Sequence, residues 1–362
     1  MNLIPWAKPN LTKNDINRVK QTLNSGWISG GSDVGRFEDN LKNFLKSKYV
    51  CVTNNGTSAI NLSFLALGLK PGDEIIVPGF GYMAAANIGK LMGLKIKFAD
   101  VCIESFCTSL KEIKKLCSNN TKLIVVTHTY GNMSEIEEIC RFAKQKKIYV
   151  LEDCAESLGS IYNKKQSGTF GDIGTFSFHA TKTITTGEGG AICTKSKKIY
   201  EKIKLYRSHG VRKKRYYHYV PGHNFRLTNF QCSMGISQFK RIKNIKKKRQ
   251  KIYQLYLNKL IKGNLNFQIF DKNLSANIWT FSVLLNKKFT KKKRDILMKS
   301  LLKKGIETRN GFYSAQELKY FNKIKNLPNS KRLSDRVINL PLFEQLTKKQ
   351  INYIAKTFLK FL

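Results

Sequence analysis

Short apolar runs alternate with longer amphipathic segments through the first half of the chain. The apolar runs are rich in β-branched residues, which is typical of buried strands. We expect strands at 49–53, 74–77, 95–99, 122–127 and 148–151, and helices at 12–25, 37–45, 56–69, 84–92 and 135–146. This alternation predicts an α/β fold with a mostly parallel sheet that is covered by helices on both faces.

The second half of the chain predicts the end of this sheet and a further domain. Two more strands are expected at 174–178 and 190–194, and a long lysine-rich helix from about Gln231 to Lys262. A strand at 277–283 and a final amphipathic helix at 349–362 would belong to a smaller unit. We therefore expect a large domain over 1–245, whose segment 1–30 is placed to contact the second domain, and a small C-terminal α+β domain over 246–362.

The composition limits the class of protein. The 362 residues are 41% hydrophobic, which is enough to bury a core and argues against global disorder. No apolar run approaches the roughly 18 residues of a membrane helix, and residues 1–6 do not resemble a secretory signal. A cytoplasmic location is expected. The eight cysteines form no C-x-x-C pair and no cluster with histidine, so no metal site is expected.

The charge is unusual, with 65 Lys and Arg against 24 Asp and Glu, a formal net charge of +41. One interpretation is a nucleic-acid-binding regulator. The other is a solvated surface rich in Lys and Asn. The densest basic runs, 243–249 and 291–294, are not interleaved with aromatic residues, which favours the second interpretation. A positive field would still attract anionic substrates.

Two residues in the middle of the chain suggest cofactor chemistry. Lys182 lies outside the basic runs, between an apolar strand and the glycine-rich turn 187–190. Asp153 follows a strand and would lie at its carboxyl end, where ligands bind in such sheets. Pyridoxal phosphate needs an amine that forms an imine with its aldehyde and a carboxylate that keeps its ring nitrogen protonated. Lys182 and Asp153 can supply these two groups.

Other segments could complete such a site. The Gly-Thr-Ser sequence at 56–58 lies at a strand-to-helix junction, where backbone N–H groups favour a phosphate. Ser177 could add a hydroxyl, and Tyr82 could stack on the ring, although a core position is an equal alternative for Tyr82. His179 is expected to be a local structural donor. Each feature is common by itself, and only their joint order and spacing point to this cofactor.

Together these segments resemble the DegT/DnrJ/StrS family of nucleotide-sugar aminotransferases, which have the type I pyridoxal-phosphate fold. The resemblance covers nearly the whole chain, from Trp-Ile-Ser at 27–29, through Glu-Asp-Cys-Ala-Glu-Ser at 152–157 and the lysine segment 177–190, to Gly-His-Asn-Phe-Arg-Leu-Thr-Asn at 222–229. It implies that Lys182 binds the cofactor covalently and moves the proton, and that Asp153 pairs with the ring nitrogen. It also implies a homodimer with shared active sites. The other implied cofactor contacts are Gly56, Thr57, Ser58 and Ser177 at the phosphate, Tyr82 on the ring, Glu156 near the phenolic oxygen, and Asn224 at the phosphate of the neighbouring subunit.

The resemblance also implies a substrate. Lys182 argues against the family members that carry histidine there and remove a hydroxyl group. The motifs are most similar to those of members that aminate C4 of GDP-4-keto-6-deoxymannose with glutamate as donor, giving GDP-perosamine. A UDP- or dTDP-linked 4-keto-6-deoxyhexose is the alternative, and amination at C3 is a further one. Trp27, Arg309 and Tyr313 are candidate substrate contacts, but after Arg309 the chain lacks the Pro and the later Pro-x-His usual in relatives.

Overall fold

A seven-stranded sheet forms the centre of the computed structural model, which describes residues 3–261, 263–321, 324 and 327–362. The strand order is β1-β9-β8-β5-β4-β2-β3, and every neighbouring pair is parallel except those that β9 makes with β1 and β8. The predicted mostly parallel sheet is thus confirmed. The strands are β1 (Tyr49–Thr53), β2 (Glu74–Pro78), β3 (Lys95–Ala99), β4 (Thr121–Thr127), β5 (Tyr149–Asp153), β8 (Ile173–Ser177) and β9 (Gly190–Thr194).

Helices cover both faces of this sheet because its strands are apolar on both sides. In β2, Ile75 and Val77 pack in one buried cluster together with residues of α3 and α4, whereas Ile76 packs in another with residues of α5 and α6. Successive side chains of a strand point to opposite faces, so one strand serves both cores. The helices of this part are α1 (Lys13–Asn24), α2 (Ser32–Leu45), α3 (Gly56–Leu67), α4 (Ala84–Leu91), α5 (Leu110–Leu116), α6 (Ile136–Gln145), α7 (Lys197–Arg207) and α8 (Asn229–Phe239).

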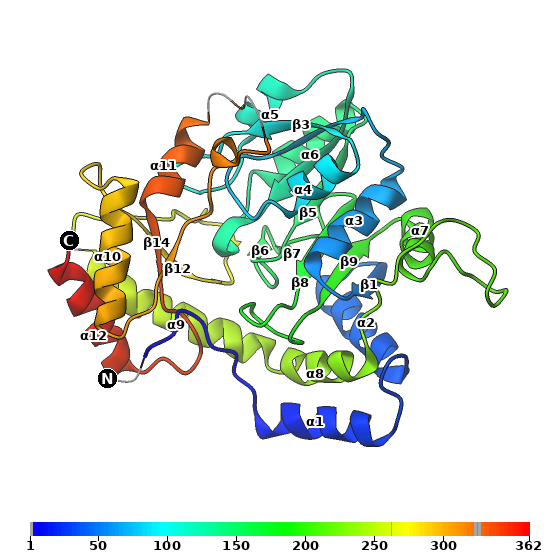
Figure 1. The fold of residues 1–362 in the computed structure, drawn as a ribbon, viewed down its shortest axis with the longest axis horizontal. Helices are drawn as coiled ribbons and strands as arrows, with labels where there is room; N and C mark the ends of the chain where they lie inside the picture. The colour runs from blue at the N-terminus through cyan, green and yellow to red at the C-terminus, as the bar shows by residue number, and fades with distance from the viewer. Residues whose placement is uncertain (1–2, 262, 322–323, 325–326) are drawn as a thin grey trace.

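A four-stranded antiparallel sheet, β10-β12-β14-β13, forms a second centre with its own core. Figure 1 shows α9 running from α8 toward α10 and α12, beside this sheet. The N-terminal segment joins this core: Ile4 is buried in it and forms a bridge with Ile306. The elements here are α9 (Ile242–Leu260), β10 (Asn266–Phe267), β12 (Phe281–Leu284), α10 (Lys291–Lys303), β13 (Arg309–Asn310), α11 (Pro328–Arg336), β14 (Val337–Leu340) and α12 (Lys348–Lys360).

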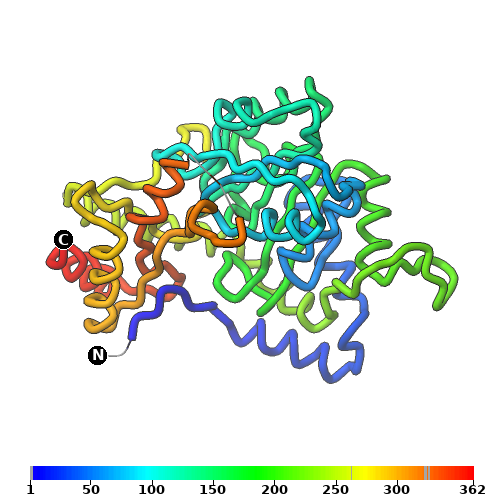
Figure 2. Tube along the Cα trace, turned by 45° about the horizontal axis from the view of Figure 1, so that its top comes forward, coloured from blue at the N-terminus to red at the C-terminus, as the bar shows by residue number. Residues whose placement is uncertain are grey.

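Two short features complete the fold. Strands β6 (Ile161–Tyr162), β7 (Lys165–Gln166) and β11 (Leu274–Ser275) form a small sheet that ties the two parts together. The connection between α7 and α8 projects from the body of the molecule in both views (Figure 1, Figure 2). None of the helices in the described part of the chain is both long and apolar enough to cross a membrane.

The prediction of one long helix from Gln231 to Lys262 is wrong. The segment forms two helices, α8 and α9, separated at Lys240 and Arg241, and Lys262 lies outside the described residues. The backbone of Arg241 leaves the helical region, and its guanidinium donates to the carbonyl of Asn10 at 2.9 Å and to Asp15 at 3.0 Å. This anchor to the N-terminal segment fixes the point at which the chain changes direction.

The strand expected at 277–283 is shorter in the structure, where β12 spans Phe281–Leu284. Residues 277–280 instead contact the loop that carries Lys182. The side-chain amide of Asn277 donates to the carbonyl of Leu158 at 2.6 Å and to the hydroxyl of Thr183 at 3.3 Å. The apolar pattern here therefore reflects burial against the large sheet.

Candidate active site

A cavity of about 680 Å³ lies at the carboxyl ends of the parallel strands. Its floor includes the last residues of three neighbouring strands, Thr127 of β4, Asp153 of β5 and Ser177 of β8. The loop after β8 and the first turn of α3 form its sides. It brings together most of the residues expected from the sequence: Gly56, Thr57, Ser58, Tyr82, Asp153, Glu156, Ser177 and Lys182.

Lys182 lies at the centre of this cavity in a tight turn, where its N–H donates to the carbonyl of His179 at 2.9 Å. Its Nζ is 3.6 Å from Oε1 of Glu156 and 3.9 Å from the centre of the Trp279 ring. Burial lowers the pKa of the Lys182 amine, and the negative charges of Glu156 and Asp153 oppose this effect. A lowered pKa increases the share of neutral amine, the form that can attack an aldehyde.

Two buried carboxyl groups face this amine. Asp153 is 5% exposed, and its Oδ1 accepts the N–H of Ala155 at 3.1 Å. Burial raises the pKa of Asp153, while the Ala155 N–H and the charge of Lys182 oppose this effect, and a further positive charge beside it would favour its ionised form. Glu156 accepts the backbone N–H of Tyr130 at 2.9 Å, and burial raises its pKa to about 7. A protonated ring nitrogen would supply the positive charge that Asp153 lacks.

The N-terminus of α3 forms the anion-binding end of the cavity. The Asn55 side chain caps this helix by accepting the N–H of Ser58 at 2.7 Å, and the first helical bond runs from Ala59 to Asn55. The N–H groups of Gly56 and Thr57 precede that bond and are available to a ligand. A Cβ at position 56 would lie 3.1 Å from the Cβ of Ser177, so glycine keeps this end of the cavity open.

Tyr82 is 66% exposed and lines the cavity, so the alternative core position is wrong. His179 also lines the cavity, and its ring accepts the Thr181 N–H at 3.3 Å, which agrees with a local structural role. An amine, a buried carboxylate, free N–H donors and an exposed aromatic ring are the groups that hold pyridoxal phosphate. The residues present therefore fit this cofactor.

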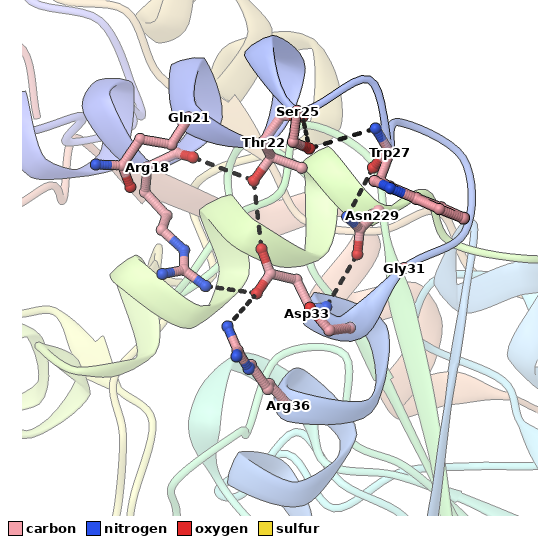
Figure 3. Close-up of a pocket in the computed structure, with 10 residues that line it drawn as sticks. Arg18, Gln21, Thr22, Ser25, Trp27, Gly31, Asp33, Arg36 and Asn229 are labelled. Atoms are coloured by element: carbon pink, nitrogen blue, oxygen red, sulfur yellow. Dashed lines mark hydrogen bonds and ion pairs between the residues drawn. The ribbon is translucent and has the colours of Figure 1, made fainter.

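Two predicted residues lie outside this cavity. Asn224 lies at the base of the connection between α7 and α8, where it forms a bridge with Ser208. Trp27 lines a different cavity of about 540 Å³, between α1, α2 and α8 (Figure 3). There Asn229 donates to the Trp27 carbonyl at 2.7 Å and accepts the Asp33 N–H at 3.0 Å, while the Trp27 side chain is 71% exposed. A single chain does not bring Trp27 or Asn224 to Lys182.

Arg309 and Tyr313 line a third cavity, of about 450 Å³. It adjoins the first, because both are lined by Trp6, Tyr82, Trp279 and Phe312. Arg309 is 2.7 Å from Glu307 in an ion pair. The shared aromatic residues other than Tyr82 were not predicted from the sequence. The chain has only three tryptophans, and this scarcity was the available signal for Trp6 and Trp279.

The buried group His128, Glu152 and Cys154 has the spacing of a metal site, but its polar atoms are already used. Glu152 accepts the N–H groups of Gly168, Phe170 and Gly171, at 2.9, 2.7 and 2.8 Å respectively. The Nδ1 atom of His128 accepts an N–H from Ser134, so its Nε2 donates to Glu152. Glu152 therefore fixes the loop 168–171 and is a structural residue.

Comparisons with known proteins agree with this fold and site. The sequence profile of the DegT/DnrJ/EryC1/StrS aminotransferase family matches residues 9–359. The GDP-perosamine synthase of Escherichia coli O157:H7 is 36% identical over 364 residues, which cover 100% of this chain and 99% of that protein. A UDP-4-amino-4,6-dideoxy-N-acetyl-beta-L-altrosamine transaminase of Campylobacter jejuni is 30% identical, covering 99% of this chain and 98% of that protein.

A solved structure shows the same fold. The PLP form of a sugar aminotransferase from Streptococcus pneumoniae, Spr1654, superposes with a TM-score of 0.94 at 23% identity, covering 99% of this chain and 98% of that one. The fold and the site define a pyridoxal-phosphate enzyme of fold type I. More narrowly, the chain belongs to the DegT/DnrJ/EryC1/StrS aminotransferase family and is a PLP-dependent sugar aminotransferase.

Proposed function

We propose that this enzyme transfers the amino group of glutamate to C4 of GDP-4-keto-6-deoxymannose and so forms GDP-perosamine. One observation carries the proposal: Lys182, Asp153 and the start of α3 meet in one cavity, and an aromatic-lined cavity adjoins it. The first cavity accommodates the cofactor, and the second leaves room for a nucleotide sugar beside Lys182. The choice of sugar is supported by the 36% identity to a GDP-perosamine synthase along the whole chain.

Each residue of the cavity has a proposed task. Lys182 holds the cofactor through its aldehyde, Asp153 accepts a hydrogen bond from the ring nitrogen, and Tyr82 covers the ring. The N–H groups of Gly56 and Thr57, with the hydroxyl groups of Ser58 and Ser177, hold the phosphate. Bound in this way, the cofactor supplies an electron sink that makes the neighbouring C–H bond acidic.

Lys182 moves the proton in both halves of the reaction. In the first half glutamate gives up its amino group and leaves as 2-oxoglutarate, and in the second the ketosugar takes that amino group. Lys182 must be a neutral amine to remove the proton, and its burial supports this form. Glu156, with a pKa near 7, lies 3.6 Å from Nζ, within ion-pair distance. Its proposed task is to hold the amine inside the cavity.

The active site is proposed to be complete only in a homodimer. Asn224 lies outside the cavity of its own chain, at the base of a projecting connection. Such a position suits a residue that reaches the phosphate site of a second copy. We also propose that the chain divides near residue 245 into the large domain and the small domain, because α9 leads from one sheet to the other.

A UDP-linked 4-keto-6-deoxyhexose is the second candidate acceptor, supported by the 30% identity to a UDP-sugar transaminase over 99% of the chain. The two candidates differ only in the nucleotide and the sugar. The test is to incubate the pure enzyme with glutamate and, separately, with GDP-, UDP- and dTDP-linked 4-keto-6-deoxyhexoses, and to measure the mass of each product. Amination of the GDP sugar with a kcat/KM at least about tenfold above the others supports the proposal. Preference for a UDP or dTDP sugar would refute it.

A further inference from the structure

Arg249 is a fully enclosed cation in α9 that the proposed chemistry does not use. Its residue exposure is 6%, and burial lowers the pKa of its guanidinium to about 10. Burying a cation without a counter-ion is expensive, several kcal/mol in typical cases. Within the described ranges, no carboxylate lies at ion-pair distance from Arg249. Glu344 lines the same small space, and its charge partly opposes the effect of burial on the Arg249 pKa, but its carboxylate pairs with Arg241 at 3.8 Å and Lys248 at 3.9 Å.

The hydrogen bonds of Arg249 go to the main chain next to the active site. Its Nη1 donates to the carbonyl of Trp279 at 2.9 Å and lies 3.5 Å from the carbonyl of Ile278, while its Nε has no partner among the described residues. Arg249 also lines a space of about 10 Å³ together with Thr181 and Lys182. The cation thus lies directly behind the loop that carries the lysine.

Trp279 connects Arg249 to that loop. Its indole Nε1 donates to the carbonyl of Thr181 at 2.9 Å, and its ring lies 3.9 Å from Nζ of Lys182. The ring is also fixed by neighbours, with Trp6 packed edge-on at 5.5 Å and Tyr130 at 5.9 Å between ring centres. The contacts therefore form one chain from Arg249, through Trp279, to the Thr181–Lys182 segment.

We propose that Arg249 is a positioning residue for Lys182: it fixes the main chain of Trp279, and the indole of Trp279 fixes the loop and the side chain of the lysine. The inference rests on the proposed role of Lys182 in binding the cofactor. It explains why a cation is kept where an apolar side chain would pack at lower cost. Burial is the main cause of the lowered pKa of the Lys182 amine, and repulsion by the positive charge of Arg249 adds to it.

The test measures how fast Lys182 captures the cofactor. Pyridoxal phosphate is added to cofactor-free enzyme, and the absorbance of the lysine-bound form is followed by stopped flow in the parent, Arg249→Met and Trp279→Phe. Trp279→Phe keeps an aromatic ring but loses the bond to Thr181. Each variant should slow capture and lower kcat by at least about tenfold, as expected for a displaced reacting group, with both KM values within about twofold. Because the two residues act in series, the double variant should be no slower than the slower single variant.

Lys246 provides the matched control on the same helix. Its Nζ donates to the carbonyls of Gly159 and Ser275 at 2.9 and 2.8 Å, and none of its hydrogen bonds in the described part of the chain goes to Trp279. Lys246→Met should lower the melting temperature without slowing capture. The inference would be overturned if Arg249→Met folds and captures the cofactor at the parental rate. It would also be overturned if the rate reductions of the two single variants multiply in the double variant. If Arg249→Met does not fold, Trp279→Phe alone decides the test, because the proposed contact to Thr181 runs through the Trp279 indole, and parental capture in folded Trp279→Phe would overturn the inference.

Failure of the proposed function would look different. Borohydride reduction followed by peptide mass spectrometry identifies the lysine that carries the cofactor in the parent enzyme. A modified residue other than Lys182 would refute the cofactor assignment itself, whatever the Arg249 variants do. Modification of Lys182 in the parent, together with unchanged capture in folded Arg249→Met, would refute only the role of Arg249.

Discussion

At the scale of single residues, the site depends on one amine in a buried setting. Replacing Lys182 with Ala removes the group that binds the cofactor and moves the proton, so turnover should fall below detection and no borohydride-stable adduct should form at position 182. Lys195→Ala is the control. Lys195 is exposed and follows the last residue of β9, and it is the first residue of β9, Gly190, that pairs with Ser177 at the cavity. A Lys182→Ala enzyme that still turns over would contradict the assignment.

Glu156 gives a prediction about stability and pH. In the unfolded chain its pKa is near 4.5, and in the cofactor-free fold burial raises it to about 7. Between these values the folded state holds a proton that the unfolded state has lost, so the contribution of Glu156 to stability falls as pH rises from 4.5 to 7. The difference corresponds to about 3 kcal/mol. Glu156→Gln, which has no such proton to lose, should become more stable relative to the parent across this range.

The measurement for Glu156 is urea unfolding of both cofactor-free proteins at pH 5 and pH 7.5. The free energy of unfolding of Glu156→Gln minus that of the parent should be larger at pH 7.5. Because the comparison is a difference between two proteins, the titration of other groups cancels to first order. A difference that stays constant or shrinks with pH would show that Glu156 is already ionised in the folded state at pH 5.

At the scale of elements, the start of α3 decides how the phosphate is held. Gly56→Ala adds a Cβ 3.1 Å from that of Ser177 at the anion-binding end of the cavity. Relief of this contact would move Ser177 or the first turn of α3, both of which line the anion-binding end. A loss of about 1.4 kcal/mol of binding free energy would raise the Kd for pyridoxal phosphate, measured by titration of cofactor-free enzyme, about tenfold.

Gly35→Ala in α2 is the matched control for Gly56→Ala. A Cβ at Gly35 meets no atom within 4 Å, and its backbone is not in the left-handed region. Alanine stabilises an exposed helix position by about 0.5–1 kcal/mol relative to glycine, so Gly35→Ala should stabilise the fold without changing cofactor affinity. Equal losses of affinity in both variants would mean that the position of Gly56 beside the cavity is irrelevant.

The elements of the large sheet were predictable because local pattern and tertiary burial agree there. The expected strands at 49–53, 95–99 and 190–194 match β1, β3 and β9 residue for residue, and Thr12 with Asp15 forms the capping box that begins α1. The break between α8 and α9 was not predictable, since Arg241 bonds to residues more than 200 positions earlier. The two-residue strands β6, β7 and β10 likewise carry too little local pattern to be recognised.

The candidate site could likewise be predicted only in part from the sequence. Lys182, Asp153 and the 56–58 turn were predicted because motifs at strand ends identify the catalytic edge of a parallel sheet. Trp6 and Phe312 were missed, since they come from the two ends of the chain and meet only in the folded molecule. Burial also raises the pKa of Asp153 and Glu156 above that of surface acids. The sequence motif alone does not predict this shift, because burial depends on the folded structure.

At the scale of the whole molecule, the cavity carries little positive charge in a chain of net charge +41. Among the described residues that line it, Lys182 is the one lysine or arginine, against three acids, Asp153, Glu156 and Glu188. A cofactor phosphate and a nucleotide diphosphate would add further negative charge. In the proposed homodimer, the second copy would supply further polar and positive groups, and the projecting connection 208–228 carries four consecutive cations, Arg212, Lys213, Lys214 and Arg215.

Shared sites predict complementation between two inactive variants. If Asn224 serves the site of its partner, a dimer of one Lys182→Ala chain and one Asn224→Ala chain contains one intact site. The intact site takes Lys182 from one subunit and Asn224 from the other. Co-expression with two different tags, followed by purification on both, isolates this mixed dimer. Its activity should be about half that of the parent, because one of the two equivalent sites is complete, whereas each variant alone should be strongly impaired.

A second mixed dimer tests the geometry behind this result. Lys182→Ala paired with Asp153→Asn should recover nothing, because both residues line the same cavity of one chain and every site in that dimer is damaged. Recovery of activity in the first pair but not in the second would show that one active site contains residues of both subunits. It would exclude the explanation that mixing two variants only stabilises the protein. No recovery in the first pair, or full activity of Asn224→Ala by itself, would mean that Asn224 does not serve the active site of the partner.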